Sequence, residues 1–111
     1  MMNNVTKAVH SITKEQMIEA LRPITDPEIR IGIVDLGLVY DVDINDAGEA
    51  KVKMTLTSPA CPFGEMIIAM CHRAIEELDG VTKVDVVIVW EPVWDPKEMA
   101  SDLAKDQLGI W

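Results

Sequence analysis

The sequence predicts an α/β (α+β) fold, a two-layer sandwich in which a small mixed sheet carries helices packed on one face. Two runs of alternating apolar residues, 38–44 and 50–56, are separated by a turn-rich stretch and predict a β-hairpin. A long amphipathic run, 62–78, and a further apolar run, 84–90, predict a helix that crosses over to a parallel third strand. With one helix before the hairpin and one after the last strand, the predicted order is α-β-β-α-β-α.

The first helix is predicted to begin after Thr13. Thr13 as N-cap and Gln16 three residues later form the pattern of a capping box, and Ile12 and Met17 form a hydrophobic staple. After this helix, the dipeptide Asp26-Pro27 predicts a turn or a short helical piece that leads toward residues 33–37. The buried stripe of the helix is predicted to consist of Met17, Ile18 and Leu21.

The register of the hairpin is predicted from charge as well as from the apolar pattern. If residues 45–49 form the loop, Asp43 faces Lys51 and Asp41 faces Lys53 across the antiparallel pair. The inward faces then consist of Leu38, Tyr40, Val42 and Ile44 in one strand and Ala50, Val52, Met54 and Leu56 in the other. The outward face of the second strand is expected to carry Lys51, Lys53, Thr55 and Thr57.

The strongest predicted helix covers residues 62–78. Pro62 is expected at its first position and Gly80 after its end, so that Cys61 becomes the N-cap residue. Cys71 lies on the apolar stripe and is expected to pack in the core. The full stripe consists of Phe63, Ile67, Met70, Cys71, Ala74, Ile75 and Leu78.

A last helix is predicted over residues 96–108. Asp95 is its expected N-cap, Pro96 its first residue and Gly109 its end. The candidate packing residues are Met99, Ala100, Leu103 and Leu108.

The third strand predicts an additional cover for the sheet. Val87 and Val89 lie on the face opposite to Val84, Val86, Ile88 and Trp90, so both faces of this strand are apolar. Either the last helix or a second subunit could cover the outer face. Because Trp90, Trp94 and Trp111 fall in the same part of the sequence, and aromatic residues are enriched where subunits meet, a homodimer is predicted.

The composition limits the class of protein. The chain has 111 residues, and residues 1–111 are expected to form a single domain. A formal net charge of −9 and scattered lysines and arginines exclude the basic surface that nucleic-acid binding requires. No apolar run suits a signal peptide or a bilayer span, so an acidic cytoplasmic protein with no membrane partner is expected. Both cysteines are expected to be reduced thiols.

Cys61 is the candidate functional residue. At an N-cap its sulfur would lie at the positive end of the helix dipole, which stabilises a thiolate by roughly 0.3–1 kcal/mol. Glu65 opposes this effect because its carboxylate competes for the same helix end. Pro59 and Pro62 restrict the backbone, which suits presentation of a ligand better than nucleophilic attack. The alternative interpretation of Cys61 is a small residue in a strand-to-helix turn.

Other metal and thiol sites are disfavoured by residue spacing. Cys61, Cys71, His72 and His10 lack the short ligand spacing of structural zinc sites. No second cysteine follows Cys61 at the distance used in redox motifs, and no glycine-rich phosphate loop occurs.

Three motifs resemble the MIP18 (DUF59) family, in its SufT-like branch: residues 26–29 (DPEI), 33–40 (IVDLGLVY) and 57–62 (TSPACP). The resemblance covers residues 13–94 and implies the fold of an iron–sulfur cluster assembly domain. It also implies a role in maturing iron–sulfur proteins, with Cys61 as the functional residue and metal ligand. The candidate cofactor-binding residues that it adds are Asp26, Glu28, Asp35 and Thr57. For Asp26 and Glu28, a capped turn with a solvated carboxylate is the alternative.

Three functions follow as hypotheses. The first is a non-enzymatic assembly factor in which Cys61 binds a transient iron–sulfur cluster or iron, and no cofactor is tightly bound. The remaining ligands would come from a second subunit, a small thiol, or a partner that is a client apo iron–sulfur protein or another assembly factor. The second is an adaptor for a metalloenzyme or an aromatic-degradation complex, in which residues 90–94 contact the client. The third, a thiol-dependent enzyme, lacks an identifiable base.

Overall fold

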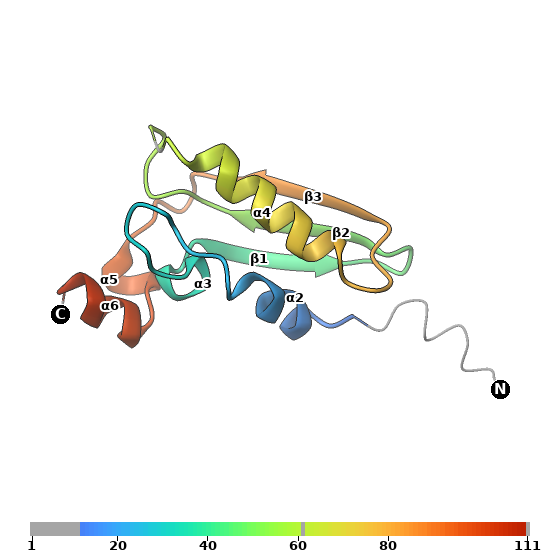
Figure 1. The fold of residues 1–111 in the computed structure, drawn as a ribbon, viewed down its shortest axis with the longest axis horizontal. Coiled ribbons are helices and arrows are strands. Elements are labelled where there is room, and N and C mark those ends of the chain that lie inside the picture. Colours follow the sequence, from blue (N-terminus) through green and yellow to red (C-terminus); the bar gives the residue numbers. More distant parts are fainter. Residues whose placement is uncertain (1–11, 61, 111) are drawn as a thin grey trace.

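The computed structural model describes residues 12–60 and 62–110 (Figure 1). Its elements are α2 (Lys14–Leu21), α3 (Ile33–Leu36), β1 (Val39–Ile44), β2 (Glu49–Met54), α4 (Gly64–Glu76), β3 (Lys83–Ile88), α5 (Pro96–Met99) and α6 (Asp102–Leu108). The predicted fold class is confirmed, with α3 as an additional short helix and the last helix divided in two. In the part of the chain that the structure describes, no helix has both the length and the apolar character to cross a membrane.

The sheet has the predicted topology and register. The strand order is β1-β2-β3, with β1 antiparallel and β3 parallel to β2. Asp43 pairs with Lys51 and Asp41 with Lys53, as charge complementarity predicts. A bulge between Val39 and Asp41 shifts the register at the start of β1.

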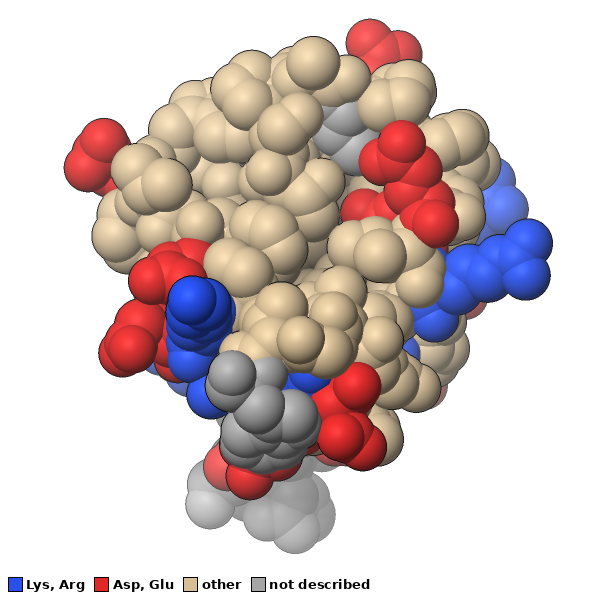
Figure 2. All heavy atoms as spheres, turned by 90° about the vertical axis from the view of Figure 1, so that its left-hand side faces the viewer, with Lys and Arg blue, Asp and Glu red and all other residues tan. Residues whose placement is uncertain are grey.

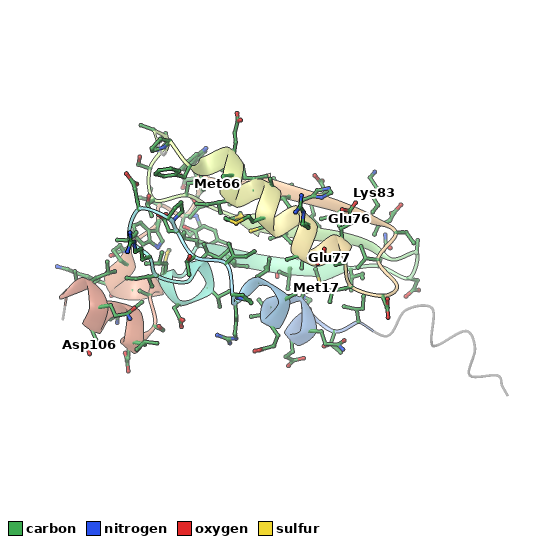
Figure 3. The ribbon with its side chains drawn as sticks, in the orientation of Figure 1. Met17, Met66, Glu76, Glu77, Lys83 and Asp106 are labelled. Carbon is green, nitrogen blue, oxygen red and sulfur yellow. The ribbon has the colours of Figure 1, made fainter. Side chains whose placement is uncertain are left out.

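The core lies between the sheet and the helices α2 and α4, which contact each other as well as the strands (Figure 1). Met17 points from α2 into this layer (Figure 3). The predicted burial of Cys71 is confirmed, since its side chain is fully buried on the inner stripe of α4. The other core residues of these elements are Leu21, Val42, Ala50, Val52, Met54, Ile67 and Ile75.

The start of α2 confirms the predicted capping box. The backbone N–H of Gln16 donates to Thr13 Oγ1 at 3.1 Å, and the backbone N–H of Thr13 donates to Gln16 Oε1 at 2.8 Å. Ile12 packs against the edge of the core. Two free backbone donors of the first turn are therefore satisfied by local side chains alone.

The start of α4 corrects the sequence prediction. The helix begins at Gly64 with Phe63 as N-cap, and Pro62 lies in the preceding turn instead of the first helical position. Gly64 packs closely against the strand end at this start, because a Cβ atom there would lie 2.8 Å from Leu56 Cδ1 and this side-chain end would have to shift. The prediction that Cys61 is the N-cap of this helix is therefore wrong. The argument that the helix dipole stabilises a Cys61 thiolate depends on that position and is wrong as well. Cys61 itself lies outside the described residues.

The C-terminal region also differs from the prediction of one helix. Asp95 and Pro96 start α5 as predicted, but Ala100 is extended and Ser101 begins α6 as a second N-cap. The Ser101 side chain accepts from the N–H of Ala104 at 3.2 Å, and its backbone N–H donates to the Asp35 carbonyl at 2.7 Å. After this break, α6 buries Ala104, whereas the predicted packing residue Leu103 is 61% exposed.

The helices α5 and α6 lie beyond one end of the sheet, where α6 packs against α3 (Figure 1). The indole Nε1 of Trp94 donates to the Leu36 carbonyl at 2.8 Å and holds the connecting segment in place. The predicted extension of the third strand to Trp90 is wrong, because β3 ends at Ile88. The homodimer stays a prediction.

Candidate functional site

A groove opens where the parallel strands β2 and β3 end. The last backbone hydrogen bond between the two strands runs from the Val89 N–H to the Met54 carbonyl at 2.8 Å, and beyond it the two segments diverge. The carboxyl ends of parallel strands are the usual place for ligand sites in open α/β sheets. The cavity of about 320 Å³ between the two segments is called the strand-end groove below. Its lining residues are Thr55, Leu56, Thr57, Ser58, Pro59, Trp90, Glu91, Val93 and Trp94.

Hydrogen bonds from the fold hold the wall formed by residues 90–94. Besides the bond from Trp94, the Tyr40 hydroxyl donates to the Pro92 carbonyl at 2.7 Å. Burial raises the pKa of Tyr40, so its hydroxyl stays protonated as a donor near neutral pH. The opposite wall starts with Thr55, which is buried at this end of the sheet and not exposed to solvent like Lys51 and Lys53 of β2.

The sequence-predicted residue Thr57 lines the strand-end groove, and Cys61 follows four residues later in the chain. Cys61 lies outside the described residues, but its neighbours Ala60 and Pro62 are exposed. The backbone N–H of Ala60 donates to Ser58 Oγ at 3.2 Å, a local turn that shapes the described part of this loop.

Asp26 is buried in the loop between α2 and α3. Its Oδ1 accepts from the backbone N–H groups of Glu28 at 2.8 Å and Ile29 at 3.3 Å, which confirms a capped turn. The carboxylate is not solvated, because the residue is 0% exposed and its Oδ2 has no hydrogen-bond partner among the described residues. A buried carboxylate oxygen without a partner is costly, so its environment is unusual for a simple turn.

Glu28 and Asp35 occupy two further places. Glu28 is exposed on the same loop as Asp26. Asp35 is half-buried in α3, and its charge adds to the increase in the pKa of Arg22, which comes mainly from the hydrogen bond of Arg22 with Glu19. Asp26, Glu28 and Asp35 do not line the strand-end groove, so Thr57 alone of the described site candidates lies there.

Cys71 is unsuited to thiolate chemistry in the folded protein. Burial raises the pKa of the Cys71 thiol from its ordinary value of 9.0 to about 12. The thiol is therefore protonated at physiological pH and out of contact with solvent. Within residues 12–60 and 62–110, no three or more histidine, cysteine, aspartate or glutamate side chains lie close enough together to hold a metal ion.

Iodoacetamide is expected to label Cys61 faster than Cys71 in the native protein. Cys71 is 0% exposed and its raised pKa suppresses the reactive thiolate. Peptide mapping after brief labelling measures both rates, and labelling in denaturant is the control in which the rates should converge. Preferential labelling of Cys71 in the native protein would contradict its burial.

The stability of the protein is expected to fall at alkaline pH through Cys71. Because the folded state raises the pKa of this thiol above 9.0, it contributes its full stabilisation below about pH 9 and loses it as the pH rises toward 12. The difference in the free energy of unfolding between wild type and Cys71→Ala should therefore shrink over this range. Urea unfolding of both proteins from pH 7 to 11 measures it, and a difference independent of pH would contradict a buried thiol.

Replacement of Asp26 by asparagine is expected to preserve stability, whereas replacement by alanine is expected to lower it. Asparagine keeps the oxygen that caps Glu28 and Ile29 and removes the buried charge. Alanine leaves these N–H groups without that acceptor, at a cost of about 1–3 kcal/mol. Urea unfolding compares the two variants. An equal loss for the two variants would mean that the negative charge, which both remove, stabilises the turn and the capping oxygen does not.

Several groove residues were not among the candidates from sequence. The indication available for Ser58 and Pro59 was their position after the first strand of a parallel pair. The sequence predicts segment 90–94 as a contact surface and not as the wall of a groove. Two hydrogen bonds fold this segment back toward β1 and α3, one from Tyr40 and one from Trp94. Such long-range bonds have no local sequence pattern.

Comparison with known proteins identifies the family. Residues 14–86 match the family described as iron–sulfur cluster assembly protein. The chain is 43% identical over 97 residues to the Fe-S protein maturation auxiliary factor YitW of Bacillus subtilis (strain 168), covering 87% of this chain and 94% of that protein. It is 45% identical over 87 residues to the Fe-S protein maturation auxiliary factor SufT of Staphylococcus aureus (strain USA300), covering 78% and 98%.

The fold is similar to that of a solved relative. The crystal structure of a domain of unknown function, DUF59, from Bacillus anthracis matches with a TM-score of 0.81 at 34% identity, over 88% of this chain and 92% of that one. This similarity and the sequence matches confirm the resemblance seen in the three motifs. The chain belongs to the family of iron–sulfur cluster assembly proteins, the MIP18 (DUF59) family.

Proposed function

We propose that this protein is an accessory factor in the maturation of iron–sulfur proteins, in which Cys61 supplies a thiolate ligand to a cluster or to iron in transit. The family to which the chain belongs, and relatives named as Fe-S protein maturation auxiliary factors, support this role. The cluster is cargo that passes to a client apo protein, and the factor itself is non-enzymatic. The role needs reduced thiols, which persist in the cytoplasm, so the cytoplasm is the proposed compartment.

The burial of Cys71 is the observation that carries the proposal. The chain has two cysteines, and iron–sulfur clusters are held by cysteine thiolates. Cys71 is 0% exposed, its pKa is raised to about 12, and it packs within the core. Thiolate ligation by this chain therefore depends on Cys61.

One thiolate does not complete a cluster. Clusters of the [2Fe–2S] and [4Fe–4S] types take four thiolate ligands, so further ligands must come from a second subunit, a small thiol or the client. A homodimer would supply a second Cys61 if the two sites face each other. Because this chain would supply only one of the ligands, a cluster could pass to a client when a single bond to Cys61 is replaced.

The other predicted site residues are proposed to assist Cys61. Thr57 is supported by its place in the wall of the strand-end groove, and Glu28 by its exposure on the loop between α2 and α3. Asp26 is supported by its buried oxygen without a partner among the described residues, and Asp35 by its position beside the α6 cap. These residues would position or contact the cargo and its partners.

Anaerobic reconstitution with iron and sulfide tests the proposal. Wild type and Cys71→Ala are expected to develop the visible absorption of a cluster, alone or with an apo client, whereas Cys61→Ser is not. Cys71→Ala is the matched control, because it removes the buried thiol and leaves the proposed ligand. Equal absorption for wild type and Cys61→Ser, with and without the client, would refute the role of Cys61 as a ligand.

An adaptor without cluster ligation is the second candidate function. The exposure of Trp90 and Val93 at the strand-end groove favours it, because such side chains suit contact with a client. Clients of this adaptor could include metalloenzymes or an aromatic-degradation complex. In a binding assay with the client, an adaptor keeps both client binding and client activation when Cys61 is replaced by serine.

A further inference from the structure

The strand-end groove lies within a surface that carries few charges. Figure 2 shows this end of the molecule as a broad uncharged area with acidic and basic side chains along its border. Among the described residues that line the groove, Glu91 alone is charged. The chain as a whole carries a formal net charge of −9, so an uncharged area of this kind is a distinct local feature.

Two apolar side chains stand exposed at this groove. Val93 is 72% and Trp90 is 44% exposed, although both belong to a segment that hydrogen bonds hold to the fold. Large apolar side chains on a rigid segment gain most from burial by a partner, since little ordering is required when the partner binds. The groove of about 320 Å³ is at the small end of ligand sites, which fits one aromatic or branched aliphatic side chain.

The charge of the site selects the partner. Glu91 in the groove wall and the net charge of −9 of the chain repel anions, which disfavours a small anionic thiol as occupant. The same charges attract lysine or arginine, and a cation near the face of Trp90 gains a further attraction from the ring. An apolar side chain with a basic neighbour therefore matches both the shape and the charge.

We propose that the strand-end groove docks a client segment that carries one aromatic or aliphatic side chain with a lysine or arginine within about three residues. The groove wall ends at Pro59, two residues before Cys61 in the chain, so a docked client segment is held beside the loop that carries the proposed thiolate. The role as a client site rests on the proposed function, whereas the peptide preference rests on the groove itself.

Selection from a random twelve-residue peptide library displayed on phage tests this preference. The wild-type protein is expected to enrich peptides with an apolar side chain next to a basic one. An enriched peptide is then synthesised, and its affinity is measured by tryptophan fluorescence with the Trp111→Phe variant, in which Trp90 and Trp94 report. Failure to enrich any sequence, or enrichment without basic residues, would overturn the proposal.

Matched variants locate the binding. Val93→Ser is expected to lower the affinity for the peptide by about tenfold. Leu103→Ser changes a similarly exposed apolar side chain on α6 and is expected to leave this affinity unchanged. Glu91→Lys is expected to reverse the charge preference of the selection. Glu77→Lys is its control, because Glu77 lies at the end of α4 opposite to Met66 (Figure 3). Equal effects within either pair would overturn the proposed location.

Cys61→Ser separates this inference from the proposed function. The peptide is expected to bind Cys61→Ser and wild type equally, because docking uses the groove and not the thiolate. Cluster reconstitution that fails while the peptide binds refutes the ligand role and leaves the groove as a docking site. Reconstitution that succeeds while no peptide is selected refutes the docking site and leaves the ligand role.

Discussion

Cells that carry Cys61→Ser are expected to lose about tenfold or more of the activity of iron–sulfur enzymes that depend on this factor. Soft thiolates select iron–sulfur clusters, and serine offers a hard hydroxyl in place of the proposed ligand. Changes outside the ligand shell already reduce metal affinity by about 10–100-fold, so loss of a ligand should have at least this effect. Enzyme activity in extracts, normalised to enzyme abundance, measures the loss.

Cys71→Ala is the control for this experiment. It removes a thiol that is buried and protonated, so it is expected to lower stability slightly and to leave the iron–sulfur enzymes active. Normal enzyme activity in cells with Cys61→Ser would contradict the proposed function. Loss of activity with both variants, together with low abundance of the factor, would indicate a folding defect in place of a lost ligand.

Replacement of Gly37 by alanine is expected to lower the free energy of unfolding by roughly 2–5 kcal/mol. Gly37 ends α3 in the left-handed region with φ of 81°, which a Cβ atom disfavours. A Cβ atom there would also lie 2.4 Å from the Met99 carbonyl oxygen and 2.7 Å from its carbon. Since backbone cannot move aside as a side chain can, α5 would have to shift.

Gly109→Ala is the matched control for Gly37→Ala. Gly109 also has a left-handed conformation, with φ of 69°, but no described atom lies within 4 Å of the position of its Cβ. The control therefore has only the conformational cost, about 1–2 kcal/mol. Urea unfolding of the two variants gives the difference. Equal losses would show that the contact between α3 and α5 does not restrain the fold.

Local interactions made much of the fold predictable from the sequence. The capping box of Thr13 and Gln16 joins groups three residues apart, and it occurs as expected. The hairpin register follows from the period of two in the strands and from the pairing of Asp43 with Lys51. Cys71 is buried because its place on the apolar stripe of α4 fixes which way it faces. The family motifs likewise lie in continuous stretches of sequence.

Contacts between distant segments decided the features that the sequence left undetermined. Gly64 packs closely against Leu56 at the start of α4, and the break before Ser101 is accompanied by a bond from its N–H to the Asp35 carbonyl. The strand-end groove exists because Tyr40 and Trp94 hold residues 90–94 to β1 and α3. These partners are more than 50 residues apart in the chain, and only the tertiary structure brings them together. Local periodicity and capping preferences contain no information about such pairs, so the groove, unlike the strands that lead to it, could not be predicted.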